Sequence, residues 1–342
     1  MQVTTIGLDI AKRVFQVHGV DAAGAAVIRK KLRRSELLQF FARLAPCVIG
    51  IEACATAHYW ARELTALGHQ VRLVPPSYVK AYVKRGKSDA ADPEAICEAV
   101  TRPSMRFVPV KSAEQQGVLV LHRARELLVR QRTMLVNGLR GHMAEFGITA
   151  PQGIQRVPEL VAALKDETTG IPQIAREALA AMVVQIENLT TSIKQMERRI
   201  VAWCRSNAAA RRLATIPGVG PITASALAAT ITDPTLFRSG RHLAAWLGLV
   251  PRQHSTGGKT KLGRITKMGD RYLRKLLVVG MTAVIRSARR TKAPAFAWVN
   301  ALLERRPARL VSVALANKAA RIAWAILVRG ETYRAPAMEA AA

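Results

Sequence analysis

The sequence predicts an α/β domain at the N-terminus followed by a mainly helical remainder, and two observations carry this prediction. Short apolar runs alternate with amphipathic segments over residues 1–102, whereas long heptad-like patterns occupy residues 112–146 and 174–205. Half of the 342 residues are hydrophobic, which is typical of a globular protein with more than one core. The chain also carries 52 Lys+Arg against 23 Asp+Glu, a net charge of +29.

The N-terminal elements follow a recognisable order. Three strands joined by short turns precede strand–helix crossovers, which is the order of a ribonuclease-H-like fold. A doubly wound nucleotide-binding domain would alternate from the start and would carry a Gly-rich first turn, where this chain has DIAK. We expect strands at Val3–Ile10, Val14–Val20, Ala25–Leu32, Cys47–Ile51 and Gln70–Val74, and helices after a Ser35 cap and over His58–Leu67, Ser77–Lys84 and Ala90–Val100.

The rest of the chain is predicted to be helical. The two long helices are either ordinary core helices or an arm that carries an oligomer contact. A compact region begins near Arg211, and the Ala-rich tail after Arg334 is expected to be disordered. The expected domains are residues 1–105, a helical coiled-coil connector over 106–206, a C-terminal domain over 207–334 and a tail over 335–342.

The charge predicts a polyanionic partner, and nucleic acid is favoured over an acidic membrane surface or charge kept for solubility alone. Lys and Arg are spread through folded segments, and the chain from Arg205 onward holds +19 of the +29. The four cysteines form no CxxC, so we expect reduced thiols. With no signal-peptide pattern and no uncharged stretch of membrane length, a cytoplasmic, nucleoid-associated protein without a membrane contact is expected.

Four carboxylates stand out in so basic a chain. Asp9 and Glu52 end apolar strands that neighbour each other in the expected topology, and Asp89 and Asp92 lie three residues apart at a helix start. Buried carboxylates need a partner, and converging oxygen donors suit Mg²⁺, two of which could promote in-line phosphoryl transfer. The alternative is that Asp9 is a turn residue and the other pair a solvated helix cap.

Two further segments could contact phosphate. The IPGVGPITA segment resembles a helix-hairpin-helix in which Gly218 and Gly220 let backbone N–H groups approach a phosphate; the alternative is a tight turn without a ligand. In PRQHSTGGKTKLGRITKMGDRYLR, the hydroxyls of Ser255 and Thr256 precede two glycines of an expected mobile loop. Chemistry alone favours a phosphate-binding role over a nucleophile there. The candidate nucleic-acid-binding cations are Lys259, Lys261, Arg264, Lys267, Arg271 and Arg274.

Together these motifs resemble the DEDD transposases of the IS110 type, which are related to the Piv DNA invertases. The resemblance implies a RuvC-like domain, a coiled-coil connector, and a C-terminal transposase domain with a helix-hairpin-helix. It implies that Asp9, Glu52, Asp89 and Asp92 bind Mg²⁺ (or Mn²⁺), and that Ser255 is the nucleophile, with Thr256 as its rival one residue away. It further implies a structured guide RNA, and an active site shared between protomers of a dimer or tetramer.

Three functions therefore compete. The leading one is a DNA transposase or site-specific recombinase that acts on element ends and a target. The second is a RuvC-like, structure-specific nuclease that uses metal-activated water and needs no serine. The third is a non-catalytic nucleic-acid-binding protein, for which neither the carboxylates nor the serine would matter.

Overall fold

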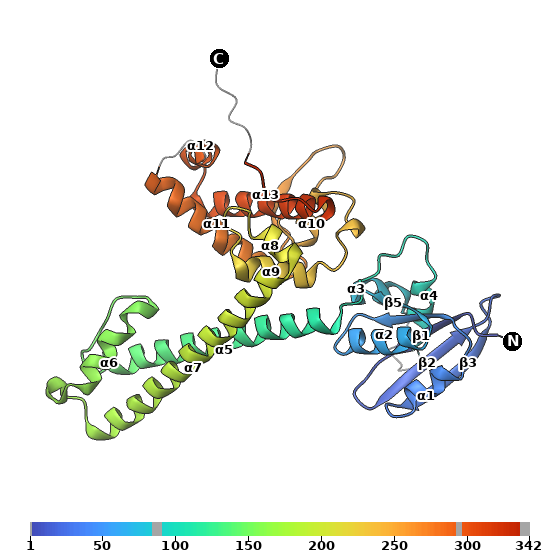
Figure 1. Ribbon diagram of the computed structural model, residues 1–342, viewed down its shortest axis with the longest axis horizontal. Coiled ribbons are helices and arrows are strands. Elements are labelled where there is room, and N and C mark those ends of the chain that lie inside the picture. The colour runs from blue at the N-terminus through green and yellow to red at the C-terminus, as the bar shows by residue number, and fades with distance from the viewer. Residues whose placement is uncertain (1, 84–90, 292–295, 336–342) are drawn as a thin grey trace, which may run out of the picture. The chain divides into compact units, whose positions relative to one another are not determined.

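The computed structural model describes residues 2–83, 91–291 and 296–335, which form two compact units, Met1–Gln116 and Gly117–Ala342 (Figure 1). Asp89 and residues 336–342 of the predicted tail lie outside the described residues. Each unit has its own hydrophobic core, so each is considered by itself.

The first unit is built on a five-stranded sheet of order β3-β2-β1-β4-β5. β2 is antiparallel to β1 and β3, whereas β4 is parallel to β1 and β5 is parallel to β4. All five predicted strands are confirmed, two of them to the residue, because alternating or continuous apolar runs mark them clearly. The strands are β1 Thr5–Asp9, β2 Val14–Val20, β3 Ala26–Arg33, β4 Val48–Glu52 and β5 Gln70–Val74.

Helices cover both faces of this sheet. Helices α1 (Leu37–Ala42) and α2 (Ala57–Ala66) pack against Ile6, Leu8 and Ile51. On the other face, α3 (Pro76–Val79) and α4 (Ala91–Val100) form a smaller core around Ile96. Because side chains alternate along a strand, the odd-numbered residues of β1 and the even-numbered residues of β4 face α4.

Two local predictions in this unit are wrong. Ser35 does not cap α1: the N-cap position is Glu36, which makes no side-chain cap bond, and its Oε2 instead accepts a hydrogen bond from the Arg33 N–H at 2.8 Å. The helix predicted over Ser77–Lys84 is only α3 and a 3₁₀ turn at Lys80–Tyr82, because Val83 takes an extended conformation.

The second unit begins with an antiparallel helical hairpin. The long helices α5 (Ala113–Ala144) and α7 (Gln173–Ser206) confirm the two predicted long helices. Arg125 donates to Glu197 at 2.6 Å and Arg132 donates to Thr190 at 3.3 Å. Residue numbers therefore increase along α5 while those of their partners on α7 decrease, as in an antiparallel pair. The short helix α6 (Val157–Lys165) packs Leu160 and Leu164 over the far end of the hairpin.

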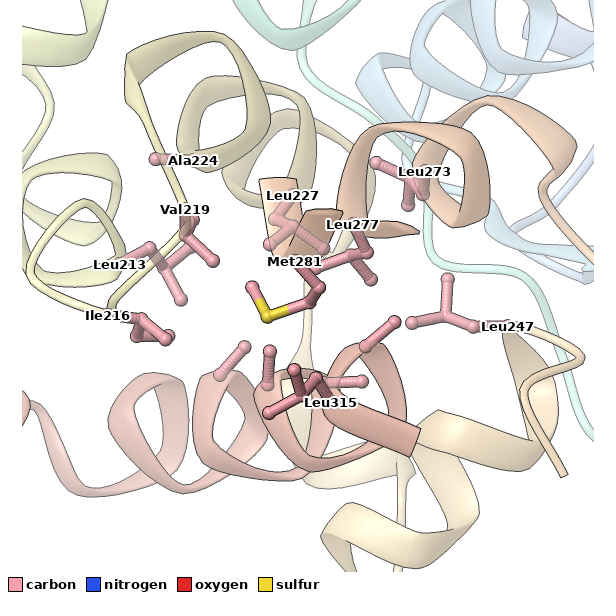
Figure 2. Close-up of a cluster of buried hydrophobic side chains, with 14 of the residues drawn as sticks. Leu213, Ile216, Val219, Ala224, Leu227, Leu247, Leu273, Leu277, Met281 and Leu315 are labelled. Atoms are coloured by element: carbon pink, nitrogen blue, oxygen red, sulfur yellow. The ribbon is translucent and has the colours of Figure 1, made fainter. Parts of the chain in front are cut away.

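The remainder of this unit is a helical bundle with a two-stranded sheet. Figure 2 shows its core, in which Leu227, Met281 and Leu315 converge from α9, α11 and α13. The elements are α8 Ala208–Leu213, α9 Pro221–Thr230, α10 Gly240–Trp246, β6 Pro251–Gln253, β7 Leu262–Ile265, α11 Arg271–Thr291, α12 Ala297–Arg305 and α13 Ala308–Arg329, with a 3₁₀ turn at Pro234–Leu236.

Helix α13 is long and apolar enough to cross a membrane by length and composition. Its buried residues, among them Val311, Leu315 and Ala323, belong to the core of the bundle, however. The core helix of a globular protein meets the same criteria, so α13 is weak evidence for a membrane contact.

A polar network is buried within this otherwise apolar unit. The His122 ring of α5 is fully buried, with Nδ1 3.0 Å from the Tyr272 hydroxyl and Nε2 3.1 Å from the Ser225 hydroxyl. Burial, together with Arg125 and Arg123, lowers the pKa of His122 from 6.5 to about 4. The network therefore ties α5 to α9 and α11 through a neutral imidazole.

We expect acid to destabilise the second unit through His122. The native ring binds its proton more weakly than the unfolded chain does, so stability is complete above pH ~6.5 and falls as the pH drops towards 4. The loss is up to about 3 kcal/mol. Urea unfolding followed by tryptophan fluorescence measures it, since Trp203, Trp246, Trp298 and Trp324 all lie in this unit.

The matched variant is His122→Gln, which keeps a polar side chain but does not titrate. Its unfolding free energy should be lower at pH 7 and should change less between pH 6.5 and 4.5 than that of the wild type. An unchanged pH dependence would show that other groups govern the acid sensitivity.

Candidate active site

Asp9 and Glu52 end the two parallel strands at the centre of the first sheet. The register pairs Leu8 with Ile51, so the next residues along the two strands are the two carboxylates. Both residues occupy the strand face that α4 covers. The prediction that these two strands are adjacent is confirmed, and both carboxylates lie at the carboxyl edge of the sheet.

Two glycines allow α4 to lie directly on this face. Gly7 and Gly50 are register partners on β1 and β4. A Cβ on Gly7 would overlap the Pro93 carbonyl oxygen and lie 2.6 Å from the Cys97 nitrogen, and a Cβ on Gly50 would lie 2.8 Å from the Val100 Cβ. The α4 backbone therefore occupies the space that two side chains would fill. Its first turn, which holds Asp92, is fixed near the carboxyl edge.

The electrostatics agree that three carboxylates share this corner. Burial raises the pKa of Glu52 above its usual value, and the negative charges of Asp9 and Asp92 raise it further. Burial and the charges of Glu52 and Asp9 also raise the pKa of the Cys54 thiol, which favours the protonated form. Like charges held together in this way stabilise a cation between them.

The described residues do not complete a metal site. Within residues 2–83, 91–291 and 296–335, no group of three or more His, Cys, Asp or Glu side chains is arranged to hold a metal ion. Asp89, the fourth predicted ligand, lies outside these ranges. The three described carboxylates nevertheless offer the hard oxygen donors that Mg²⁺ prefers, so their chemistry fits such an ion.

The predicted loop at Ser255 is instead the tip of a β-hairpin. β6 and β7 pair antiparallel, the His254 N–H donates to the Lys261 carbonyl at 2.8 Å, and Thr256 forms a bridge with Lys259. Gly257 and Gly258 have φ of +55° and +76°. This is the two-residue turn with positive φ at both positions that hairpins favour, and it explains the glycine pair.

The hairpin separates the two candidate nucleophiles. Neighbouring residues on a strand point to opposite faces, so Ser255 and Thr256 present their hydroxyls on opposite faces of the hairpin. The register places Thr256 beside Lys259, and Ser255 opposite Thr260. Both hydroxyl residues are exposed.

Most of the predicted nucleic-acid-binding cations are exposed on or beside this hairpin. Arg274 differs: its Nη1 donates to the carbonyls of Leu247 and Met268 at 2.9 and 2.8 Å and so clamps the base of the hairpin. Asp270 caps α11 next to it by accepting from the Tyr272 and Leu273 N–H groups. The exposed cations are Lys259, Lys261, Arg264, Lys267 and Arg271.

The IPGVGPITA segment forms a turn between α8 and α9, as its helix-hairpin-helix pattern predicts. Gly218 has φ of +80°, and a Cβ there would lie 2.6 Å from Met281 and Val284, so packing against α11 accounts for this glycine. Gly220 is exposed at the N-cap of α9, where no side chain caps the helix and a Cβ would meet nothing within 4 Å. Of the two, only Gly220 is open to a phosphate.

Strained backbone marks both candidate segments. Among the described residues, Thr56 and Lys267 are the non-glycine residues with positive φ, at 71° and 56°. Thr56 follows the Glu52 strand and precedes α2, and Lys267 follows β7 at the base of the hairpin. Such conformations cost about 1–3 kcal/mol each and are concentrated at functional sites.

The sequence analysis did not predict the pair Gly7 and Gly50 on which α4 packs, called the glycine platform below. Its signal was present: each strand carboxylate follows a glycine by two positions, in Gly7-Leu8-Asp9 and in Gly50-Ile51-Glu52. Because residues two apart share a strand face, this repeat indicates a helix lying close beside both carboxylates.

We expect Gly7→Ala to displace α4 and to disturb the site without altering any carboxylate. Forcing a methyl group against backbone should cost about 1–3 kcal/mol of stability and lower the catalytic activity of the site. Gly19→Ala on β2 is the control, since its Cβ would meet only side chains, at 3.2–3.4 Å. Thermal unfolding measures the loss of stability, and an activity assay measures the effect on the site. Equal behaviour of the two variants would contradict a special role for the platform.

Comparison with known proteins agrees with this geometry. A transposase model of the IS110 DEDD type matches residues 6–148, and a model of the transposase IS116/IS110/IS902 family matches residues 210–296. A probable family 20 transposase of Pseudomonas aeruginosa is 51% identical, covering 98% of this chain and 99% of its own length. The transposase of insertion sequence element IS1328 from Yersinia enterocolitica is 40% identical over 97% and 98%.

A more distant relative is the pilin gene-inverting protein of Moraxella bovis, which is 26% identical over 82% of this chain and 80% of its own. The two family models contain the carboxylate strands and the hairpin respectively. With full-length relatives at such identity, the chain belongs to the IS110 family of DEDD-type transposases, enzymes that cleave and transfer DNA strands.

Proposed function

We propose that this transposase exchanges DNA strands by a Mg²⁺-dependent reaction in which a serine is the nucleophile. The observation that carries the proposal is the shared corner of Asp9, Glu52 and Asp92, where burial and then the neighbouring charges raise the pKa of Glu52. The sheet order, with β1 between β2 and β4, supports a ribonuclease-H or RuvC-like domain. We propose domain limits of 1–105, 106–206 and 207–334, followed by a tail at 335–342.

Asp9, Glu52, Asp89 and Asp92 would hold Mg²⁺, or Mn²⁺ in its place. When bound, the ion would withdraw charge from the scissile phosphate and stabilise the charge that develops on its oxygens. The fold would fix where the ion binds, because two of the carboxylates lie on adjacent strands and the packing of α4 on Gly7 and Gly50 fixes Asp92.

Ser255 would attack the phosphate from the hairpin tip. The bond between Oγ and phosphorus forms, the bond between phosphorus and the leaving deoxyribose oxygen breaks, and the serine proton leaves to a base while the leaving oxygen takes one up. Attack by a hydroxyl of the exchanged strand reverses these events and releases the serine. The phosphodiester energy is conserved in the serine ester, so rejoining needs no ATP.

The exposed cations of the hairpin would bind the phosphates of element ends and target. We propose that a structured non-coding RNA guides target choice and that the chain works as a dimer or tetramer, with carboxylates of one protomer acting beside the serine of another. The antiparallel α5–α7 hairpin would serve as the connector, and Gly220 would contact the backbone of nucleic acid. The protein would act in the cytoplasm on nucleoid DNA.

We expect Asp9→Asn to lower strand transfer by at least ~100-fold, because it removes charge from the proposed ion site. The metal-free variant should be as stable as the wild type, or more so, since it relieves repulsion with Glu52. Mg²⁺ should raise the melting temperature of the wild type and not that of the variant. Calorimetry with and without Mg²⁺ and a recombination assay measure these effects.

Asp233→Asn is the matched control, because Asp233 lies in the other unit, where its side chain accepts from the Thr235 N–H. Full recombination by Asp9→Asn in Mg²⁺ would exclude the proposed role of the carboxylates. A lost Mg²⁺ response in the control as well would place the ion elsewhere.

We expect denaturation of a reaction with labelled DNA, Mg²⁺ and any required RNA to leave label on the wild-type protein. Ser255→Ala should form no adduct, because the Oγ that bonds to phosphorus is missing. Thr256→Ala should form a reduced but visible adduct, since it perturbs the neighbouring turn and leaves the nucleophile. Gel electrophoresis of the denatured protein detects the label.

The remaining outcomes discriminate among mechanisms. An adduct that survives in Ser255→Ala and is lost in Thr256→Ala moves the nucleophile by one residue, to the opposite face of the hairpin. Hydrolysed ends without any adduct, dependent on Asp9, would identify a nuclease that uses metal-activated water.

A further inference from the structure

A groove in the second unit lies away from the serine hairpin. It has a volume of about 850 Å³ and is lined by the start of α10, by Trp298 of α12 and by one face of α13. This is within the size range of sites for small ligands. Neither the carboxylates nor the hairpin contributes to its lining.

The lining is cationic. Arg241, Lys318 and Arg321 are exposed and contribute to the walls, and no Asp or Glu is among the lining residues. Gly240 holds the start of α10 against α13, because a Cβ there would lie 2.9 Å from the Arg321 Cα. Arg241 follows Gly240 directly, so α10 and α13 each supply one arginine to the lining of the groove.

The groove also presents an aromatic face. Trp298 is 48% exposed, and the Lys318 Nζ lies 4.3 Å from its ring centroid. The group over this indole ring is thus the ammonium of the exposed Lys318, which has a flexible side chain, and not a residue of the hydrophobic core. The other lining tryptophan, Trp324, is structural, since its Nε1 donates to the carbonyls of Pro234 and Phe237 at 3.1 Å.

We propose that this groove binds one unpaired nucleotide of DNA or RNA, with the base on Trp298 and the flanking phosphates on Arg241 and Arg321. Cations beside an exposed aromatic ring are the combination by which proteins bind single strands, because every base offers a π face and every linkage a charge. Lys318 would move from the ring to a phosphate as the base arrives. The proposal rests on the proposed function, whose cut strands and structured RNA contain unpaired nucleotides.

The test measures fluorescence anisotropy of the full-length protein with a labelled 12-nucleotide DNA, the same sequence in RNA, and a blunt DNA duplex. Trp298→Ala should weaken single-strand binding by about 5- to 150-fold, which corresponds to the ~1–3 kcal/mol of one stacked base. Duplex binding should stay within about twofold. Trp298→Phe should recover most of the loss, and a preference between DNA and RNA identifies the natural source of the nucleotide.

Charge variants test the phosphate end separately. Arg241→Ala and Arg321→Ala should each reduce the slope of log K against log salt for single strands by about 0.7, whereas Trp298→Ala should leave the slope unchanged. Arg309→Ala is the matched control, because Arg309 lies on the same α13 helix and is not among the lining residues. Circular dichroism confirms that each variant is folded.

Two results would overturn the proposal. One is an equal loss of single-strand and duplex affinity in Trp298→Ala, which would indicate a general surface contact. The other is unchanged affinity with a changed oligomeric state by light scattering, which would make the groove an interface between copies of the chain. Failure of the serine adduct would leave these binding results standing, so the two proposals fail independently.

Discussion

The close approach of α4 to the sheet is the constraint on which the N-terminal site depends. It requires that β1 and β4 lack side chains at one paired position, which Gly7 and Gly50 provide. The backbone of α4 then takes the place of those side chains, and its first turn is fixed at the carboxyl edge of the sheet. Three carboxylates from segments far apart in the sequence lie near one another there, and burial, reinforced by the charges of Asp9 and Asp92, raises the pKa of Glu52.

The hairpin that carries Ser255 combines a fixed base with an uncovered tip. The Arg274 guanidinium holds the carbonyls of Leu247 and Met268, Asp270 caps the following helix, and Lys267 adopts a strained conformation between them. Beyond this base every residue from Pro251 to Arg264 is exposed. An exposed tip on an ordered base is compatible with the nucleic-acid contact proposed for this hairpin, since few contacts within the protein would have to be broken first.

Particular residues show what could be predicted from the sequence. The strands at Val14–Val20 and Gln70–Val74 were predicted to the residue because the apolar residues that mark each strand lie within the segment itself. The adjacency of Asp9 and Glu52 followed from strand order, whereas the position of α4 depended on a glycine pair 43 residues apart. Gly218 shows a different limit: a glycine that packs against Met281 and one that approaches a phosphate look alike in sequence. Similarly, the Gly257-Gly258 pair indicates a loop, and the hairpin that it closes becomes apparent only from the pairing of the flanking residues.

The antiparallel register of α5 and α7 has a consequence for how such a chain can change length. The pairs Arg125–Glu197 and Arg132–Thr190 are seven residues apart on each helix. Inserting one residue in either helix would turn every later side chain by about 100° and break the seam, because a helix has 3.6 residues per turn. Inserting about seven residues in both would preserve the seam and move the far end by about 10 Å. The hairpin is thus a spacer whose length can change only in coordinated heptad steps.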